Sequence, residues 1–375
     1  MNVTEWLLDA DPAIRWQVMR DLLHEPEAAV SAERSRVATE GWGARLLALQ
    51  DASGQWGRES LPQGDKPEGL PDPDTRRLLR ELQGISLEDL SSYLGIDGAT
   101  LAAWEVGGPD REDEDARKYR GAVDWMWRSI GTYRPEWTST THTLVLLHEM
   151  GLDPASERSQ RAVRLVRDNS KWDHDGQDYF DGEVEPCING KTVALGAYFG
   201  VEVDSVVETL LGEQLEDGGW NCEAERGSVR GSFHTTIQVL EGFLEYQRSG
   251  SGLHDVSGAR QRAEEYLLER RLFHRLSDGE VIDPAWLQFS FPPRWHYDVL
   301  RGLDYFRKTG GAPDQRCSEA IGVVESKRQA DGRWLLENSH PGRVHFALDE
   351  GDGKPSRWNT LRAMRVLDWF HGAVQ

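Results

Sequence analysis

The sequence predicts an all-α protein built from repeated helical hairpins. One observation is a recurring Gly/Trp turn, found as "QDASGQW" (50–56), "QLEDGGW" (214–220) and "RQADGRW" (328–334). Another is a series of segments with small or apolar residues at helical spacing, which follow these turns with a period of roughly 50–60 residues. No strand-rich segment competes with this pattern.

Two sets of helices are expected along the chain. Amphipathic segments at 138–152, 187–200, 232–246, 294–306 and 356–370 form the first set, and segments at 157–169, 258–273 and 315–329 lie between them. In each Gly/Trp turn, glycine permits a sharp change of direction after a helix, and the tryptophan plugs the neighbouring helix ends. The expected order is therefore helix, turn, helix, repeated.

Composition excludes several classes of protein. With 38% hydrophobic residues among 375, the chain can bury a sizeable core. A formal charge of −21 disfavours binding to nucleic-acid phosphates and anionic lipids. No stretch approaches the roughly 20 apolar residues of a membrane helix, and three cysteines are too few for a disulfide framework. We expect a soluble, cytoplasmic protein without a membrane partner.

The Gln-x-x-x-Gly-x-Trp spacing resembles the repeats of squalene cyclases and protein prenyltransferase β subunits. Two full copies and one near copy, in which Arg328 replaces glutamine, carry the resemblance over residues 1–58 and 134–375. It implies an α/α toroid, similar to an α6/α6 barrel, whose inner helices run parallel around a cavity. It also implies cyclase, transferase or lyase chemistry on a hydrophobic or isoprenoid-like small molecule.

Residues 62–130 interrupt the repeat. Within them, "ISLEDLSSYLGIDGATLAAWEVG" (85–107) resembles the helix-turn-helix of the lambda-repressor-like family. Leu87 and Leu90 fill the first helix, Gly95 makes the turn, and Leu101 and Trp104 anchor the second helix. We therefore expect a small inserted helical subdomain.

The insert lacks the side chains that read DNA. The exposed positions expected on its second helix are Asp97, Gly98, Ala99, Ala102 and Ala103, where base recognition needs Arg, Lys, Gln or Asn. Residues 75–128 carry eight basic and eleven acidic side chains, so the attraction to phosphates is missing too. A nucleic-acid partner is disfavoured, and the small face is expected to contact another subunit, which allows a homo-oligomer.

The first turns of the inner helices are expected to converge at one end of the toroid. The unpaired N–H groups of helix N-termini favour an anionic group there. We predict Glu185, His234, His296 and Asp298 as catalytic residues. The predicted ligand-binding residues are His142, Asn189, Trp295, Tyr297, Arg343, Trp358 and Asn359.

Thiolate and imidazole groups at this end also suggest zinc, which commonly has three protein ligands in catalytic sites. Cys187, His234 and His296 are the predicted ligands. In protein prenyltransferases the zinc ligands are an Asp-x-Cys pair and a later histidine; "VEPCING" is similar to that pair, with Glu185 in place of aspartate, and "RWHYDVLRGL" is similar to the histidine helix.

Two alternatives need no metal. In the first, carboxyl groups before the second inner helix act as acid or base, as in class II terpene cyclases, although the Asp-x-Asp-Asp run of those enzymes is absent from the inner helices. In the second, the cavity only binds a hydrophobic or aromatic small molecule, and the protein is a sensor or a resistance or regulatory protein. The irregular stretch 333–359 is expected to cover the cavity mouth, with Arg343 or Arg357 as a clamp for a carboxylate or phosphate.

Overall fold

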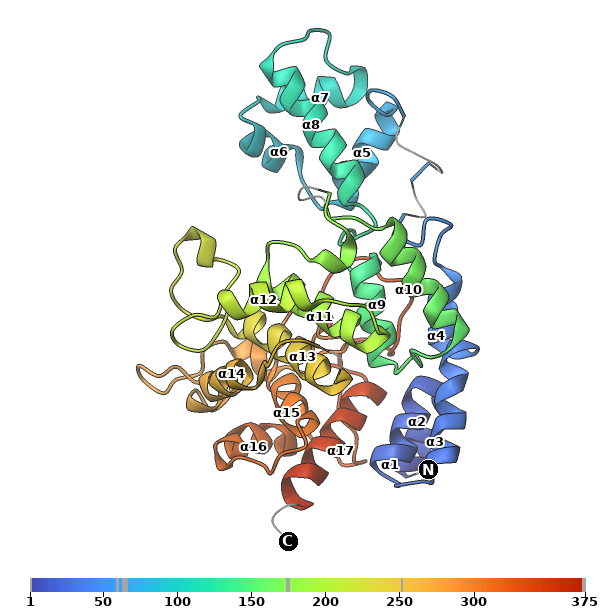
Figure 1. The fold of residues 1–375 in the computed structure, drawn as a ribbon, viewed down its shortest axis with the longest axis vertical. Coiled ribbons are helices and arrows are strands. Elements are labelled where there is room, and N and C mark those ends of the chain that lie inside the picture. Colours follow the sequence, from blue (N-terminus) through green and yellow to red (C-terminus); the bar gives the residue numbers. More distant parts are fainter. Residues whose placement is uncertain (1, 59–60, 63–66, 173–175, 251, 373–375) are drawn as a thin grey trace.

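The computed structural model describes residues 2–58, 61–62, 67–172, 176–250 and 252–372 (Figure 1). Across these residues the chain forms α-helices and short 3-10 helices, and pairing between extended segments is limited to isolated bridges. The all-α prediction is confirmed. Nowhere in the described part of the chain is a helix long and apolar enough to cross a membrane.

The described residues contain seventeen α-helices. Four precede the insert, namely α1 (Val3–Leu8), α2 (Pro12–Asp21), α3 (Glu27–Ser35) and α4 (Gly41–Ala48). The insert contributes α5 (Pro73–Leu82), α6 (Leu87–Leu94), α7 (Gly98–Gly107) and α8 (Glu114–Ser129). The remaining helices are α9 (Thr140–Glu149), α10 (Glu157–Asn169), α11 (Pro186–Phe199), α12 (Asp204–Gly212), α13 (Phe233–Ser249), α14 (Ser257–Glu269), α15 (Val299–Lys308), α16 (Ser318–Ser326) and α17 (Arg357–Gly372).

Short 3-10 helices punctuate the loops at Arg36–Ala38, Tyr179–Asp181, Ala224–Arg226, Pro284–Leu287 and Gln315–Cys317. The expected helix at 294–306 begins later than the sequence indicates, at Val299. Asp298 starts it, because its carboxylate accepts the N–H of Arg301 as an N-cap. Arg294 has a φ of 59°, which a helix does not accommodate, so His296 lies in the preceding loop.

The tryptophans of the three Gly/Trp turns make the same two hydrogen bonds. Each indole N–H donates to a carbonyl in the last turn of the preceding helix, with 2.7 Å between nitrogen and oxygen. Helices leave the carbonyls of their last turn unpaired. Each backbone N–H donates to a threonine hydroxyl in the first turn of the next helix outside the insert, which for Trp56 is α9. The sets are Trp56 with Leu46 and Thr140, Trp220 with Leu210 and Thr236, and Trp334 with Val324 and Thr360.

Glutamine adds a third tie in the first two turns. The side-chain amide of Gln50 donates to the carbonyls of Gly54 and Ala162, and that of Gln214 donates to those of Gly218 and Ala259. Ala162 lies in α10 and Ala259 in α14. Each complete turn therefore joins three helices through hydrogen bonds that use backbone groups, which explains why its residue types recur.

The described hydrophobic side chains gather in two clusters. The larger one takes residues from the helices before the insert and from those after it. The smaller one lies wholly within residues 61–130, and helices α5–α8 stand apart from the rest (Figure 1). In the insert, Gly95 ends α6 with a φ of 70°, and Leu101 and Trp104 of α7 are buried. The insert thus has its own core.

Contacts between helices also connect the two ends of the chain. Helix α9 contacts α11, and α11 contacts α13; α15 contacts α17, which contacts α2. Helix α2 contacts α4, and α4 contacts α9. The guanidinium group of Arg365, in α17, donates to Gln17 at 2.7 Å and pairs with Asp21 at 3.2 Å. Helices α2 and α17, which are distant in sequence, are therefore packed together.

Candidate functional site

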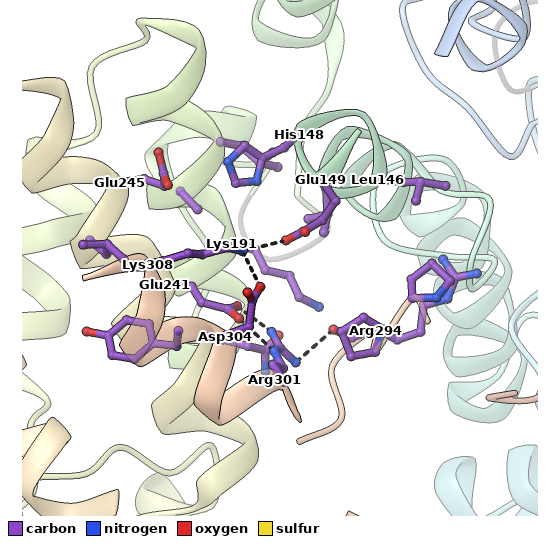
Figure 2. Close-up of a pocket in the computed structure, with 18 of the residues that line it drawn as sticks. Leu146, His148, Glu149, Lys191, Glu241, Glu245, Arg294, Arg301, Asp304 and Lys308 are labelled. Atoms are coloured by element: carbon purple, nitrogen blue, oxygen red, sulfur yellow. Dashed lines mark hydrogen bonds and ion pairs between the residues drawn. The ribbon is translucent and has the colours of Figure 1, made fainter. Parts of the chain in front are cut away.

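A cavity lies among α9, α11, α13, α15 and α17 and the loop 291–294 (Figure 2). Its empty space, with that at its mouth, is about 980 Å³. The walls include apolar side chains from several helices, among them Val145, Leu146, Ala194, Leu195, Leu244 and Phe291. Charged side chains from other positions on the same helices reach into the same space (Figure 2).

One part of the cavity holds paired charges. Arg301 binds Glu241 through two hydrogen bonds, of 2.9 Å and 2.6 Å. The ammonium group of Lys308 lies 3.4 Å from Asp304 and 3.8 Å from Glu149 (Figure 2). Buried charges require such partners, and here the protein supplies them itself.

Elsewhere in the cavity, polar groups are buried without such partners. Lys191 Nζ, His142 Nε2 and Gln238 Oε1 make no hydrogen bond with the described residues. Lys191 is only 5% exposed, and burial lowers the pKa of its ammonium group to about 8. Burial also holds the pKa of His142 well below its usual value. Three unpartnered polar atoms on α9, α11 and α13 thus line one cavity.

Arg294 adds a second cation to this part of the cavity. Burial lowers the pKa of its guanidinium group to about 9, and no ion pair with it occurs among the described residues. The group lies over the ring of Trp137, 5.1 Å from the centroid. Lys191 in turn lies 5.6 Å from the ring centroid of Tyr133. A carboxylate or phosphate between Lys191 and Arg294 would meet two cations that the protein leaves without a carboxylate.

Of the predicted ligand-binding residues, His142 lines the cavity. Asn189, Tyr297 and Asn359 are not among its lining residues, because each holds a neighbouring backbone segment. Asn189 exchanges two hydrogen bonds with the backbone of Glu183, and Asn359 donates to the carbonyls of Phe289 and Leu335. The Tyr297 hydroxyl donates to the carbonyl of Leu272.

Trp295, Trp358 and Arg343 also lie outside the cavity lining. Trp295 is 37% exposed and stacks on His296, with ring centroids 3.6 Å apart. Trp358 is buried and stacks on Phe291 at 4.2 Å. The side chain of Arg343 is exposed, and its carbonyl accepts the N–H of Trp137 at 2.6 Å.

The C-terminal stretch 337–356 packs against the segment that leads into α9. The indole N–H of Trp137 donates to the carbonyl of Pro341 at 2.9 Å. The His345 ring nitrogen Nε2 lies 2.8 Å from the hydroxyl of Thr143 in α9. Because His142 is the neighbour of Thr143, these contacts hold the stretch beside the end of α9 at which the cavity begins.

The predicted catalytic histidines lie near each other but in an aromatic stack. The rings of His234 and His296 are 5.9 Å apart, and His296 stacks on His340 at 3.8 Å. Burial lowers the pKa of His296 to about 3 and those of His234 and His340 to about 4. The Nδ1 atom of His234 accepts the N–H of Tyr297. At neutral pH all three rings are uncharged.

The predicted carboxylates differ in their surroundings. Asp298 is buried, which raises the pKa of its carboxyl group, and one of its oxygens caps α15. Its other oxygen, Oδ2, has no hydrogen-bond partner among the described residues. Glu185 is exposed and precedes α11. Neither residue lines the cavity that holds Lys191.

The predicted zinc ligands are not brought together as a set. Among the described residues, one group of three His, Cys, Asp or Glu side chains has its ligand atoms within 4.8 Å of one another, and it consists of Glu185, Cys187 and Cys222. The sequence predicted Cys187 with His234 and His296 instead. In the structure α15 starts late, so His296 lies in a loop, where it stacks on His340. Zinc binding by that set stays a prediction.

Several residues of the site were not predicted from the sequence. Lys191 is the one charged residue in the otherwise uncharged helix α11, a signal that points to a buried cation. Cys222 follows Trp220 by two residues and therefore stands at a fixed place in the second Gly/Trp turn. Gln238 and Arg294 have no comparable signal, because their positions depend on how α13 and the loop 291–294 pack.

Comparisons with known proteins identify no relative: no family model, no curated protein and no solved structure matches the chain. The function is therefore inferred from the cavity and from the thiol cluster, which consists of Glu185, Cys187 and Cys222. Fold alone would not fix the chemistry in any case, since one scaffold supports many reactions.

Proposed function

We propose that the helices outside the insert form an α/α toroid around the cavity. The support is the sequence of helix contacts that runs from α9 through α11 to α13, from α15 through α17 to α2, and back through α4 to α9. The ion pair between Glu241 of α13 and Arg301 of α15 bridges the remaining step. The repeated bonding of the three Gly/Trp turns supports the resemblance to cyclase and prenyltransferase repeats in the same way.

We propose that the cavity binds a small molecule with an apolar body and an anionic group. The observation that carries this proposal is the presence of unpartnered polar atoms of His142, Lys191 and Gln238 in one cavity. A buried ammonium group without a counter-ion is costly, and an anionic ligand group removes that cost through charge-assisted hydrogen bonds. The apolar walls would take the body of the ligand. An isoprenoid diphosphate combines both features.

The test compares three probes in a calorimetric titration. Geranyl diphosphate has the apolar body and the anion, geraniol has only the body, and inorganic diphosphate has only the anion. We expect geranyl diphosphate to bind at least about tenfold more tightly than either of the others, as charge-assisted hydrogen bonds to a buried cation predict. If geraniol binds as tightly as geranyl diphosphate, the anionic group has no role and the proposal fails.

A matched pair of variants assigns the binding to the cavity. Lys191→Met removes the buried ammonium group and keeps most of the side-chain volume. Lys171→Met serves as the control, because Lys171 pairs with Asp178 at the surface. We expect the first variant to weaken geranyl diphosphate binding by about tenfold or more and the second to leave it unchanged. Equal losses in both would mean that the ligand binds elsewhere.

For the reaction, we propose cyclase-, transferase- or lyase-type chemistry on this ligand, as the resemblance implies. A second candidate is a sensor or regulatory protein that binds without turnover. It is favoured by the fact that His234, His296 and Asp298 do not line the cavity. Mass spectrometry of the ligand after long incubation separates the two: a changed ligand supports an enzyme, and tight binding of an unchanged ligand supports the sensor.

A further inference from the structure

Two cysteines distant in sequence meet beside the start of two helices. Cys187 lies in the first turn of α11, and Cys222 lies in the loop after Trp220. Together with Glu185 they place two sulfurs and a carboxylate oxygen within 4.8 Å of one another. The Cys187 sulfur lies 3.5 Å from Glu185 Oε2, and the Cys222 sulfur lies 3.5 Å from the hydroxyl of Thr235.

Separate structural features hold the two thiols in place. Glu185 and Cys187 flank Pro186, which begins α11 and fixes the backbone there. Cys222 follows Trp220, which is fully buried and tied to both α12 and α13 by its two hydrogen bonds. The backbone that carries the three donors is therefore held by contacts outside the cluster. Cys187 is buried and Glu185 is exposed, so an ion can enter from the carboxylate side.

The chemistry of this donor set is specific. Two thiolates and one carboxylate are ligands that Zn²⁺ accepts, and soft sulfur ligands disfavour Mg²⁺ and Ca²⁺. Metal–sulfur bonds of about 2.3 Å and metal–oxygen bonds of about 2.0–2.2 Å require donors somewhat under 4 Å apart. The separations here need only a small inward movement. Three protein ligands would leave a fourth position open, as in catalytic zinc sites.

We propose that Glu185, Cys187 and Cys222 bind one zinc-class divalent cation with an open coordination position. This set differs from the one that the resemblance implies, since Cys222 replaces both histidines. It stands independently of the ligand proposed for the cavity. Lys191 lies one helical turn after Cys187 on α11, so the buried ammonium group and the proposed site share a face of this helix.

The test is a Co²⁺ titration of the full-length, metal-stripped and fully reduced protein. Cobalt bound by thiolates gives an intense sulfur-to-metal charge-transfer absorption, which reports the ligand type without any enzymatic assay. We expect one equivalent of Co²⁺ to produce this band and one equivalent of Zn²⁺ to displace it. A titration without the band, in protein whose thiols are shown to be free, would overturn the proposal.

Cysteine variants identify the ligands. Cys222→Ser should lose the band and weaken Zn²⁺ binding by at least about 100-fold, since even outer-shell partners of a metal contribute up to that much. Cys317→Ser is the matched control, because Cys317 is buried beside α16, outside the cluster. Cys222 is only partly buried, so its replacement is compatible with folding. Equal metal binding by Cys222→Ser and wild type would also contradict the proposal.

Thiol labelling separates a metal site from a disulfide pair. Zn²⁺ should protect Cys187 and Cys222 from alkylation while both remain reduced. If the two cysteines instead form a disulfide under mild oxidation and Zn²⁺ gives them no protection in the reduced protein, the cluster is a redox pair and the metal proposal is wrong.

Discussion

Lys191 is a residue whose charge the folded protein disfavours. Its ammonium group is buried without a hydrogen-bond partner among the described residues, and burial lowers its pKa to about 8 from the usual 10.5. The charged form is therefore disfavoured in the folded protein relative to the unfolded one. A neighbouring anionic group would remove this penalty.

The difference between the pKa of Lys191 in the folded protein and in the unfolded chain predicts how the free energy of unfolding depends on pH. Between about pH 8 and 10.5 the unfolded chain binds the Lys191 proton and the folded protein does not, so the free energy of unfolding rises with pH over this window. Below pH 8 Lys191 is protonated in both states, so the folded protein carries the full cost of burying its ammonium group. Lys191→Met should therefore be more stable than wild type at pH 7, by as much as about 3 kcal/mol, and lose this advantage as the pH approaches 10.5.

Urea unfolding of both proteins at pH 7, 9 and 10.5 measures the difference, and Lys171→Met corrects for general alkaline effects. A constant difference between Lys191→Met and wild type across this range would show that Lys191 is not held in a charge-disfavouring environment.

Three partly buried histidines predict a complementary change of stability in acid. With folded pKa values of about 3 to 4, His234, His296 and His340 stay neutral while the unfolded chain takes up protons near pH 6.5. The free energy of unfolding should therefore fall as the pH drops from about 6.5 to 4. His340→Phe keeps a ring against His296 and should reduce the slope of this fall, whereas His24→Asn, at an exposed position, should not. Denaturant titrations at several pH values measure both slopes.

At the scale of the element, the first two Gly/Trp turns require glycine because their backbone lies in close contact with a neighbouring helix. Gly218 has a φ of 87°, and a Cβ atom there would lie 2.5 Å from the carbonyl oxygen of Arg262 in α14. A Cβ atom at Gly54 would lie 2.6 Å from the Cβ atom and 2.8 Å from the carbonyl oxygen of Leu165 in α10. The third turn is looser, because a Cβ at Gly332 would meet nothing closer than 3.6 Å.

Alanine substitutions should separate the cost of a Cβ contact with a neighbouring helix from the cost of a positive φ. Gly310→Ala is the control, because Gly310 also has a positive φ, of 76°, but a Cβ there would have open space. We expect Gly310→Ala to cost about 1 kcal/mol for its backbone conformation alone. Gly218→Ala should cost clearly more, about 2–4 kcal/mol, since α14 must also move. Thermal unfolding of the two variants would contradict this account if their losses were the same.

Sequence reasoning succeeded where a local pattern determines local structure. The 157–169 segment is α10, residue for residue, because its apolar spacing and Ser156 cap define both a face and a start. It failed for α15, where the cap at Asp298 outweighs the apolar pattern that begins at residue 294. The thiol cluster could not be read from sequence, since Cys222 reaches Cys187 only through the packing of α13 on α11.

At the scale of the whole molecule, the insert and the main body have separate hydrophobic cores. The points where the chain enters and leaves the insert are close, because the Arg58 guanidinium group donates to the carbonyl of Ile130 at 2.7 Å. Segments with their own core and adjacent ends tolerate removal.

Replacing residues 62–130 by a short flexible linker should therefore leave the main body folded. We expect one cooperative thermal transition and the helical circular dichroism of the remaining helices. A linker variant that unfolds at a much lower temperature, or without cooperativity, would show that the insert supports the main core.

The intact protein should also fail to bind duplex DNA in the salt-sensitive manner of DNA-binding proteins. Helix α7 exposes Ala99, Ala102 and Ala103, and the insert has more acidic than basic residues. Fluorescence anisotropy with labelled duplex at 50 and 200 mM salt tests this. A steep fall in affinity between the two would contradict the charge argument.

The packing of α17 against α2 has a consequence for the making of the protein. Arg365, which binds both Gln17 and Asp21, is synthesised 348 and 344 residues after them, respectively. At about 5–20 residues per second, the first helices wait roughly 20–70 s for this neighbour. During that time α2 can pack on α1, α3 and α4, but the side of α2 that contacts α17 stays uncovered, so this side of the nascent chain is open to chaperones.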